Sequence, residues 1–127
     1  THAETARIWR QVMEIENYLL LEGQPVVRAL FFNRWLREVE DLRARTAKAF
    51  QELDLLEKAH VDGPFTAVDC LLVPFLKSLQ RASLKAGASN VGVLPLELEK
   101  RWPRLAGRLE QIEALDGYAR TFPPHWR

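Results

Sequence analysis

The chain has 127 residues, 47% of them hydrophobic, which suits one compact domain with a buried core and argues against disorder. Its 18 Lys and Arg residues nearly balance its 17 Asp and Glu residues, so the net charge of +1 gives no electrostatic case for nucleic acid or an anionic membrane. The single cysteine, Cys70, cannot form an internal disulfide, and the apolar runs are far shorter than the roughly 20 residues of a membrane span, so we expect a soluble cytoplasmic domain.

Helical periodicity predicts a first helix over residues 3–22 with an unusually wide apolar face. One neighbouring helix could not cover such a face, so this helix should contact two neighbours. Gly23 and Pro25 are expected to end it, and Pro25 can open a short helix through Phe32. The two adjacent apolar stripes are Ile8, Val12, Ile15 and Leu19, and beside them Trp9, Met13 and Leu20.

Residues 34–60 form the most regular segment, with a narrow apolar seam and a charged back. This pattern is typical of a long helix packed nearly antiparallel to another helix. The seam consists of Val39, Leu42, Thr46, Ala49, Leu53 and Leu56, widened by Phe50.

The stretch GPFTAVDCLLVPFL, residues 63–76, begins the next predicted helix and then places Pro74 inside it. Thr66 and Asp69 have the spacing of a capping box, in which each side chain accepts a hydrogen bond from the other residue's backbone N–H. Phe65 and Cys70 are placed for a hydrophobic staple across the cap. Because nearly all sides of this helix are apolar, we expect a central buried helix that Pro74 bends.

The remaining segment also has helical signals. Residues 87–92 break the central helix, and Trp102-Pro103 begins another. Asp116 can cap a last short helix that reaches Phe122. No stretch alternates with the period of a strand, so the sequence predicts an all-α bundle. The inward positions of the helix after Trp102 are Leu105, Leu109 and Ile112.

The stretch FTAVDCLLVPFL resembles the C-terminal all-helical domain of the glutathione transferase superfamily, which carries an S/T-x-x-D box and often a proline at this spacing. The segment RWPRLAGRLEQIEALDGYARTF, residues 101–122, is similar to the helices that follow the box in that family, although Asp116 stands where proline is usual. The resemblance covers essentially residues 1–127 and implies a helical bundle of this type, without the N-terminal thioredoxin-like domain.

The resemblance implies that the parent protein is a glutathione transferase, with glutathione as its co-substrate. This domain alone would bind no cofactor; it would wall the pocket for a hydrophobic small-molecule electrophile and support a homodimer. Trp9, Arg10 and Met13 are the candidate pocket residues. The alternative is a non-catalytic helical protein-interaction module of the same fold.

Each candidate residue also has a purely structural interpretation. Trp9 and Met13 at helical spacing could simply be core, and Arg10 could be solvated. Cys70 is expected to be buried and inert, and Asp69 to be a cap, so no catalytic residue is assigned. The histidines are too scattered to indicate a metal site; they are His2, His60 and His125. Glutamates neutralise the basic residues around Trp102, so we expect a solvated helix face there rather than a nucleic-acid surface. These basic residues are Lys100, Arg101, Arg104 and Arg108.

Overall fold

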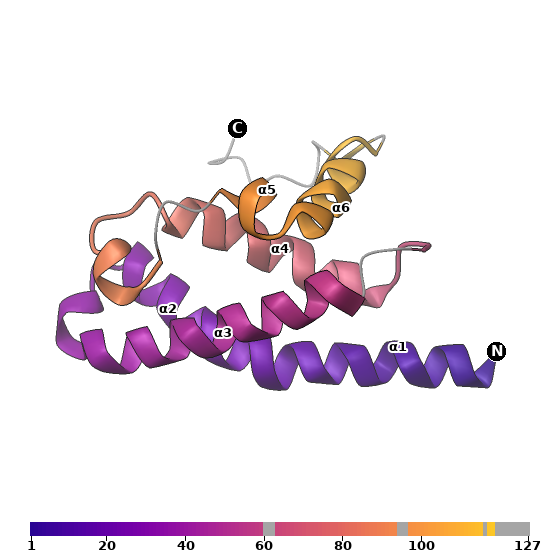
Figure 1. Cartoon of the computed structure of the whole chain (residues 1–127), viewed down its shortest axis with the longest axis horizontal. Coiled ribbons are helices and arrows are strands. Elements are labelled where there is room, and N and C mark those ends of the chain that lie inside the picture. Colours follow the sequence, from indigo (N-terminus) through magenta and orange to yellow (C-terminus); the bar gives the residue numbers. More distant parts are fainter. Residues whose placement is uncertain (60–62, 94–96, 116, 119–127) are drawn as a thin grey trace.

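The structure, a computed structural model, describes residues 1–59, 63–93, 97–115 and 117–118. All regular elements in these ranges are helices, with no strand among them, so the all-α prediction is confirmed (Figure 1). The elements are α1 (His2–Glu14), η1 (Ile15–Leu20, a π-helix), α2 (Leu21–Phe31), η2 (Trp35–Glu38, a 3-10 helix), α3 (Val39–Ala59), α4 (Ala67–Ala82), η3 (Ser89–Val91, a 3-10 helix), α5 (Leu98–Arg101) and α6 (Pro103–Glu113).

The first three elements follow one another without a break and form one long helical rod, along which α3 runs back (Figure 1). Helix α4 packs against all three parts of the rod, and α6 packs against α3. Apolar side chains from the rod, α3, α4 and α6 meet in one core. The least exposed large side chains of that core are Leu19, Leu42, Leu53, Leu76, Leu98, Trp102 and Leu105.

The prediction that Gly23 and Pro25 end the first helix is wrong, because the rod continues through both residues to Phe31. Gly23 is needed for packing rather than for a cap: a Cβ on it would lie 2.5 Å from Cζ of Phe75 on α4. Pro25 leaves the carbonyl of Leu21 without its usual helical donor. Arg45 of α3 replaces that donor, with its Nη1 3.3 Å from the Leu21 oxygen. The helix therefore tolerates a proline that a neighbouring helix compensates.

Three residues of the first predicted stripe, Val12, Ile15 and Leu19, are buried, and the fourth, Ile8, is half-buried and packs against the core. The residues of the second predicted stripe differ in exposure. Trp9 and Met13 are exposed, whereas Leu20 packs against the core. The π-helix between Met13 and Leu20 has more residues per turn than an α-helix, so Leu20 no longer follows Met13 on the same face.

The predicted seam of the long helix is confirmed, although its first turn is the 3-10 helix η2 and Val39 is half-buried. The predicted end of this helix at His60 lies outside the described residues, as do Asp116 and Phe122 of the expected last helix. The buried residues of α3 are Leu42, Thr46, Ala49, Phe50, Leu53 and Leu56.

Helix α4 begins after Thr66, as predicted, and continues through Pro74 to Ala82. The expectation that it is buried on nearly all sides is wrong, because Cys70 and Pro74 are exposed. The carbonyl that Pro74 deprives of its usual helical donor belongs to Cys70, which is exposed as well. Both residues line a hollow between α2 and α4 rather than the packed core.

The turn after α4 and the start of α6 agree with the sequence prediction. Gly87 and Gly92 have φ of 87° and 89°, a conformation that favours glycine. Pro103 is the first residue of α6, and Leu105, Leu109 and Ile112 are buried beneath it. In the part of the chain that is described, no helix has the length and apolarity to cross a membrane.

The contact between Gly23 and Phe75 predicts that Gly23→Ala lowers the free energy of unfolding by about 1–3 kcal/mol, because the added methyl overpacks the interface of α2 and α4. Gly107→Ala is the matched control, since no atom lies within 4 Å of its Cβ position on α6. That variant should be stabilised by about 0.5–1 kcal/mol. Urea unfolding followed by circular dichroism measures both, and two shifts of the same sign would contradict the packing.

Candidate functional site

The start of α4 is held by the predicted capping box, which is present in full. Thr66 has extended backbone angles, and its hydroxyl accepts from the first-turn backbone, with the Val68 nitrogen at 3.2 Å. In the other direction, Oδ2 of the Asp69 carboxylate accepts from the Thr66 backbone N–H, at 2.8 Å from the nitrogen. Two helix-end donors are therefore satisfied without water.

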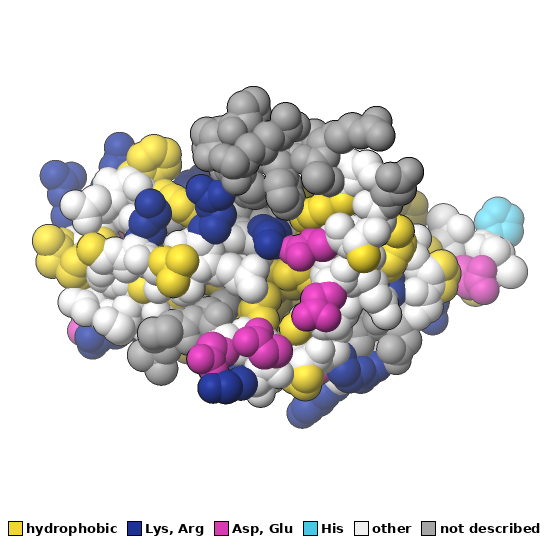
Figure 2. All heavy atoms as spheres, turned by 90° about the horizontal axis from the view of Figure 1, so that it is seen from above, with side chains coloured by type: hydrophobic (Ala, Val, Ile, Leu, Met, Phe, Trp, Pro, Cys, Tyr) yellow, Lys and Arg dark blue, Asp and Glu magenta, His cyan; other side chains and the backbone are white. Residues whose placement is uncertain are grey.

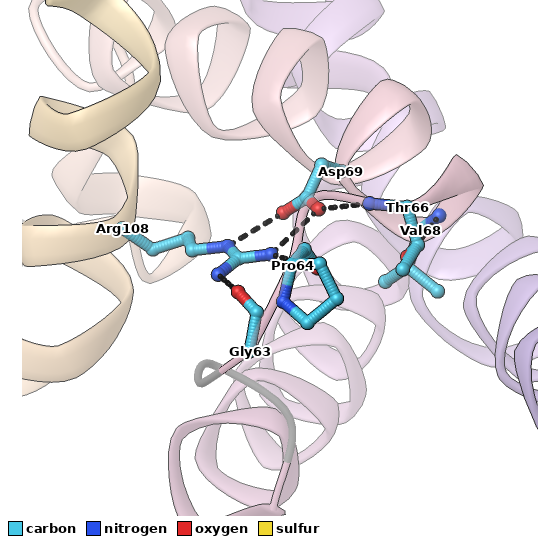
Figure 3. A network of polar contacts seen from close by, with 6 residues as sticks. All are labelled: Gly63, Pro64, Thr66, Val68, Asp69 and Arg108. Atoms are coloured by element: carbon cyan, nitrogen blue, oxygen red, sulfur yellow. Dashed lines mark hydrogen bonds and ion pairs between the residues drawn. The ribbon is translucent and has the colours of Figure 1, made fainter.

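The same carboxylate also binds Arg108 of α6 (Figure 3). The Arg108 Nε lies 2.9 Å from Asp69 Oδ1, and Nη2 lies 2.9 Å from Oδ2, which makes a two-point contact between two buried side chains. Nη1 and Nη2 also donate to the carbonyls of Gly63 at 2.7 Å and Pro64 at 3.0 Å. We call these residues, with Thr66, the Arg108 knot.

The expectation that Arg108 lies on a solvated basic face is wrong, since it is only 7% exposed. The sequence held a signal for this. Arg108 falls between Leu105, Leu109 and Ile112 at helical spacing, on the stripe of α6 that faces the core. A charged residue on such a stripe indicates a buried partner, because an unpaired buried charge is strongly disfavoured.

The predicted staple between Phe65 and Cys70 is not a buried contact, because both residues are exposed. The Phe65 ring instead lies against the guanidinium of Arg108, with 4.6 Å between the Arg108 Cζ and the ring centroid. Phe65 therefore covers the outer side of the knot.

The knot engages both oxygens of the Asp69 carboxylate. Oδ1 and Oδ2 both accept from Arg108, and Oδ2 also accepts from the Thr66 N–H. These contacts hold the buried carboxylate inside the fold, as a helix cap and an ion-pair partner. Its role as a structural cap agrees with the prediction.

The other basic residues around Trp102 are also engaged within the chain. Arg104 donates to the carbonyls of Glu57 and Lys58, and Arg101 lies over the Phe50 and Trp102 rings. Lys100 is exposed and pairs with Glu97. These contacts orient the side chains toward α3 and α5 rather than toward a common outward surface.

The three pocket candidates lie on the outer side of α1. Trp9 is 59% exposed and Met13 is 58% exposed, so the interpretation that both are core is wrong. Arg10 is exposed beside them. None of the hollows described below is lined by these residues, so they form an open surface rather than a closed pocket. We call Trp9, Arg10 and Met13 the α1 outer face.

A hollow of about 260 Å³ lies next to the knot, between α1 and the start of α4. Its walls are mixed: Glu4, Arg7 and Gln11 of α1 and Thr66 and Asp69 of the knot supply polar groups, and Ile8, Pro64 and Val68 are among the apolar residues. The volume is near the lower end of the range for small-molecule sites.

A second hollow, of about 330 Å³, separates the rod from the open side of α4. Cys70 lines it, so the expectation that this thiol is buried is wrong. Val27, Leu71 and Phe75 give the hollow an apolar lining, and Arg28 is the charged group of its wall.

A third hollow, of about 300 Å³, lies between the rod and α3 and carries the carboxylates of Glu14 and Glu52. Burial raises the pKa of the Glu52 carboxyl, and the charge of Glu14 raises it further. Two carboxylates that repel each other make this hollow unsuitable for an anionic ligand.

A metal centre has no support in the described ranges, which contain no group of three or more His, Cys, Asp or Glu side chains placed to hold an ion. His2 is exposed at the start of α1, and His60 and His125 lie outside the described residues.

Comparison with known proteins adds no relative: no family model, no curated protein and no solved structure matches this chain. The resemblance to the glutathione transferase helical domain therefore rests on the residues quoted for it.

The Arg108 knot predicts that Arg108→Met lowers the free energy of unfolding by about 3–5 kcal/mol, because it leaves the buried Asp69 carboxylate and the two carbonyls without their donor. Arg108→Lys keeps the charge but loses the two-point contact, so its loss should be intermediate. Urea unfolding measures both variants.

Lys100→Met is the matched control, because its ion pair with Glu97 is exposed and should contribute less than about 1 kcal/mol. Thr66→Ala should cost about 1 kcal/mol through the loss of the cap alone. Equal losses for Arg108→Met and Lys100→Met would show that the knot is not a special point of the fold.

Proposed function

We propose that this chain is the helical domain of a glutathione transferase, in which the α1 outer face walls the pocket for a hydrophobic electrophile. The observation that carries the proposal is the exposure of Trp9 and Met13, one turn apart, on a helix that packs against the core through Val12. An indole and a thioether suit a permissive apolar site, because both present large polarisable surfaces.

The proposal needs a second wall, since the α1 outer face is open. In the proposed parent protein an N-terminal thioredoxin-like domain supplies that wall together with the glutathione site. The helical domain alone therefore binds no glutathione. The capping box at the start of α4 and the proline eight residues later support the resemblance on which this rests. Arg10, beside the apolar pair, could then meet a glutathione carboxylate across the domain boundary.

The second candidate is a non-catalytic helical module that assembles with another protein. The absence of a hollow at Trp9 and Met13 favours it, because a flat apolar surface fits a protein partner better than a small molecule. The two candidates differ in what covers the α1 outer face and in whether glutathione is used.

Activity distinguishes them. In the full-length protein, Trp9→Ala and Met13→Ala should each raise the KM for a nitroaryl halide electrophile about tenfold, because each removes apolar contact with that substrate. The KM for glutathione should stay unchanged. Leu84→Ala is the control, since Leu84 is 84% exposed beyond the end of α4 and not on α1.

Calorimetry on the present chain completes this test. We expect no glutathione binding, and micromolar binding would contradict the assignment of the thiol site to another domain. A full-length protein without conjugating activity would favour the assembly module.

We also propose that the present chain self-associates as a homodimer, because an apolar face that lacks its cover is rarely left in water. Trp9→Ser or Met13→Ser should raise the dissociation constant about tenfold or more, since each removes an apolar side chain from the contact. Sedimentation equilibrium measures it. Leu84→Ser, at an even more exposed apolar site on another segment, should leave association unchanged. A monomer at high micromolar concentration would rule out the dimer.

A further inference from the structure

The near-neutral net charge hides an uneven distribution of charge along the chain. Residues 23–37 and 70–93 contain six of the 18 Lys and Arg residues and none of the 17 Asp and Glu residues. The first range covers most of α2 and the turn after it, and the second covers most of α4 and the turn after that. Because α2 packs against α4, the two acid-free ranges lie next to each other. The six cations are Arg28, Arg34, Arg37, Lys77, Arg81 and Lys85.

The two ranges meet at one end of the molecule, where α2 turns into α3 and the chain leaves α4 (Figure 1). Lys85 Nζ lies 5.4 Å from the centroid of the Phe31 ring. Gly87 lies against the Trp35 indole so closely that a Cβ would be 2.1 Å from its Cε2. In Figure 2, hydrophobic and basic side chains predominate at this left-hand end, and most acidic ones lie nearer the middle. We call this end, with the cations Arg28, Arg34, Arg37, Arg81 and Lys85, the basic end.

Three large apolar side chains project from the basic end. Phe32 is 67% exposed, Leu36 is 71% exposed and Leu84 is 84% exposed. Each lies at or beyond a helix end: Phe32 closes α2, Leu36 lies in η2, and Leu84 follows α4. Asn33, with φ of 55°, turns the chain between the first two. The three residues therefore stand on separate turns and are divided by cations.

The nearest carboxylates are directed toward other cations. Glu40 and Asp41 pair within α3, with Arg43 at 3.5 Å and Arg45 at 3.0 Å, and the charge of Glu38 also acts on Arg45. Lys77 is paired with Glu113 at 2.7 Å and does not belong to the basic end. Glu38, Glu40 and Asp41 line a hollow together with Leu36 and Arg37, so the charge beside η2 is mixed. The positive excess at this end is carried by Arg28, Arg34, Arg81 and Lys85.

We propose that the basic end docks on an anionic lipid surface, with Phe32, Leu36 and Leu84 inserted between the lipid headgroups. The positive charge selects a negatively charged occupant. Apolar side chains on separate turns need a surface that yields around each one, which lipid does and a folded acidic protein, with fixed pockets, does not. Arg and Lys side chains can lie along the headgroups while neighbouring apolar groups enter the acyl boundary.

Vesicle sedimentation with this chain tests the proposal. We expect binding to phosphatidylcholine vesicles that contain phosphatidylserine, weaker binding as salt is raised, and little binding to phosphatidylcholine alone. Arg37→Gln and Lys85→Gln should each weaken binding roughly fivefold, the usual effect of one cation near such a surface. Leu36→Ser and Leu84→Ser should weaken it about tenfold, and both variants should stay folded because the two side chains are exposed.

Trp9→Ser is the matched control, because it removes an exposed apolar side chain from α1 instead. Equal loss in that variant, equal binding to neutral vesicles, or no binding to anionic vesicles would overturn the proposal. Binding to an acidic polyglutamate peptide without vesicle binding would also overturn it and indicate a protein partner. None of these outcomes depends on the glutathione transferase proposal, whose test uses a different face and a different measurement.

Discussion

The contact between Arg108 and Asp69 is the constraint on which one whole end of the bundle depends. One guanidinium joins the middle of α6 to the turn at Gly63 and Pro64 and to the start of α4 that follows it. A buried ion pair of this kind adds little net stability compared with apolar groups of the same shape, because both charges lose their water. We expect its main contribution to be selectivity, since a placement of α6 that buries one of these charges without the other would be strongly disfavoured.

Helix α6 is tied to the fold at its start as well. Its N-cap position is Trp102, which has no side-chain cap to offer, and Glu57 of α3 takes over that function. The Glu57 carboxylate oxygens lie 2.7 Å from the Arg104 nitrogen and 2.8 Å from the Leu105 nitrogen. The Trp102 indole, fully buried, donates to Asp54 of the same helix at 2.7 Å. Helix α3 thus supplies the acceptors that α6 lacks, and α6 in turn positions Arg108 for α4.

The rigid interior leaves two apolar surfaces uncovered, at opposite ends of the rod (Figure 1). The α1 outer face carries Trp9 and Met13, and the basic end carries Phe32, Leu36 and Leu84. Their surroundings differ, because acid-free segments flank only the second. A domain partner on α1 and a lipid surface at the basic end would not compete for the same residues, so both proposals can hold together.

The sequence by itself determined the helices and their inward stripes, because helical periodicity and caps are local. The capping box of Thr66 and Asp69, the start of α6 at Pro103 and the seam of α3 all followed from spacing and residue type. Predictions from local sequence were wrong where a residue distant in sequence packs against the segment or supplies its missing hydrogen bond. Gly23 and Pro25 are strong helix-ending signals, yet Phe75 fills the space that Gly23 leaves and Arg45 donates to the carbonyl that Pro25 leaves.

Only the tertiary structure decided which apolar and charged side chains would be covered. Periodicity gives a direction around a helix axis, but burial depends on whether another helix lies there. Trp9 and Cys70 therefore proved exposed, although each belonged to an apolar face. Arg108 proved buried, because Asp69, 39 positions earlier, meets it only once α4 and α6 are packed. The cations of the basic end also come together only through helix packing. Their two ranges are far apart in sequence and form one surface because α2 packs against α4.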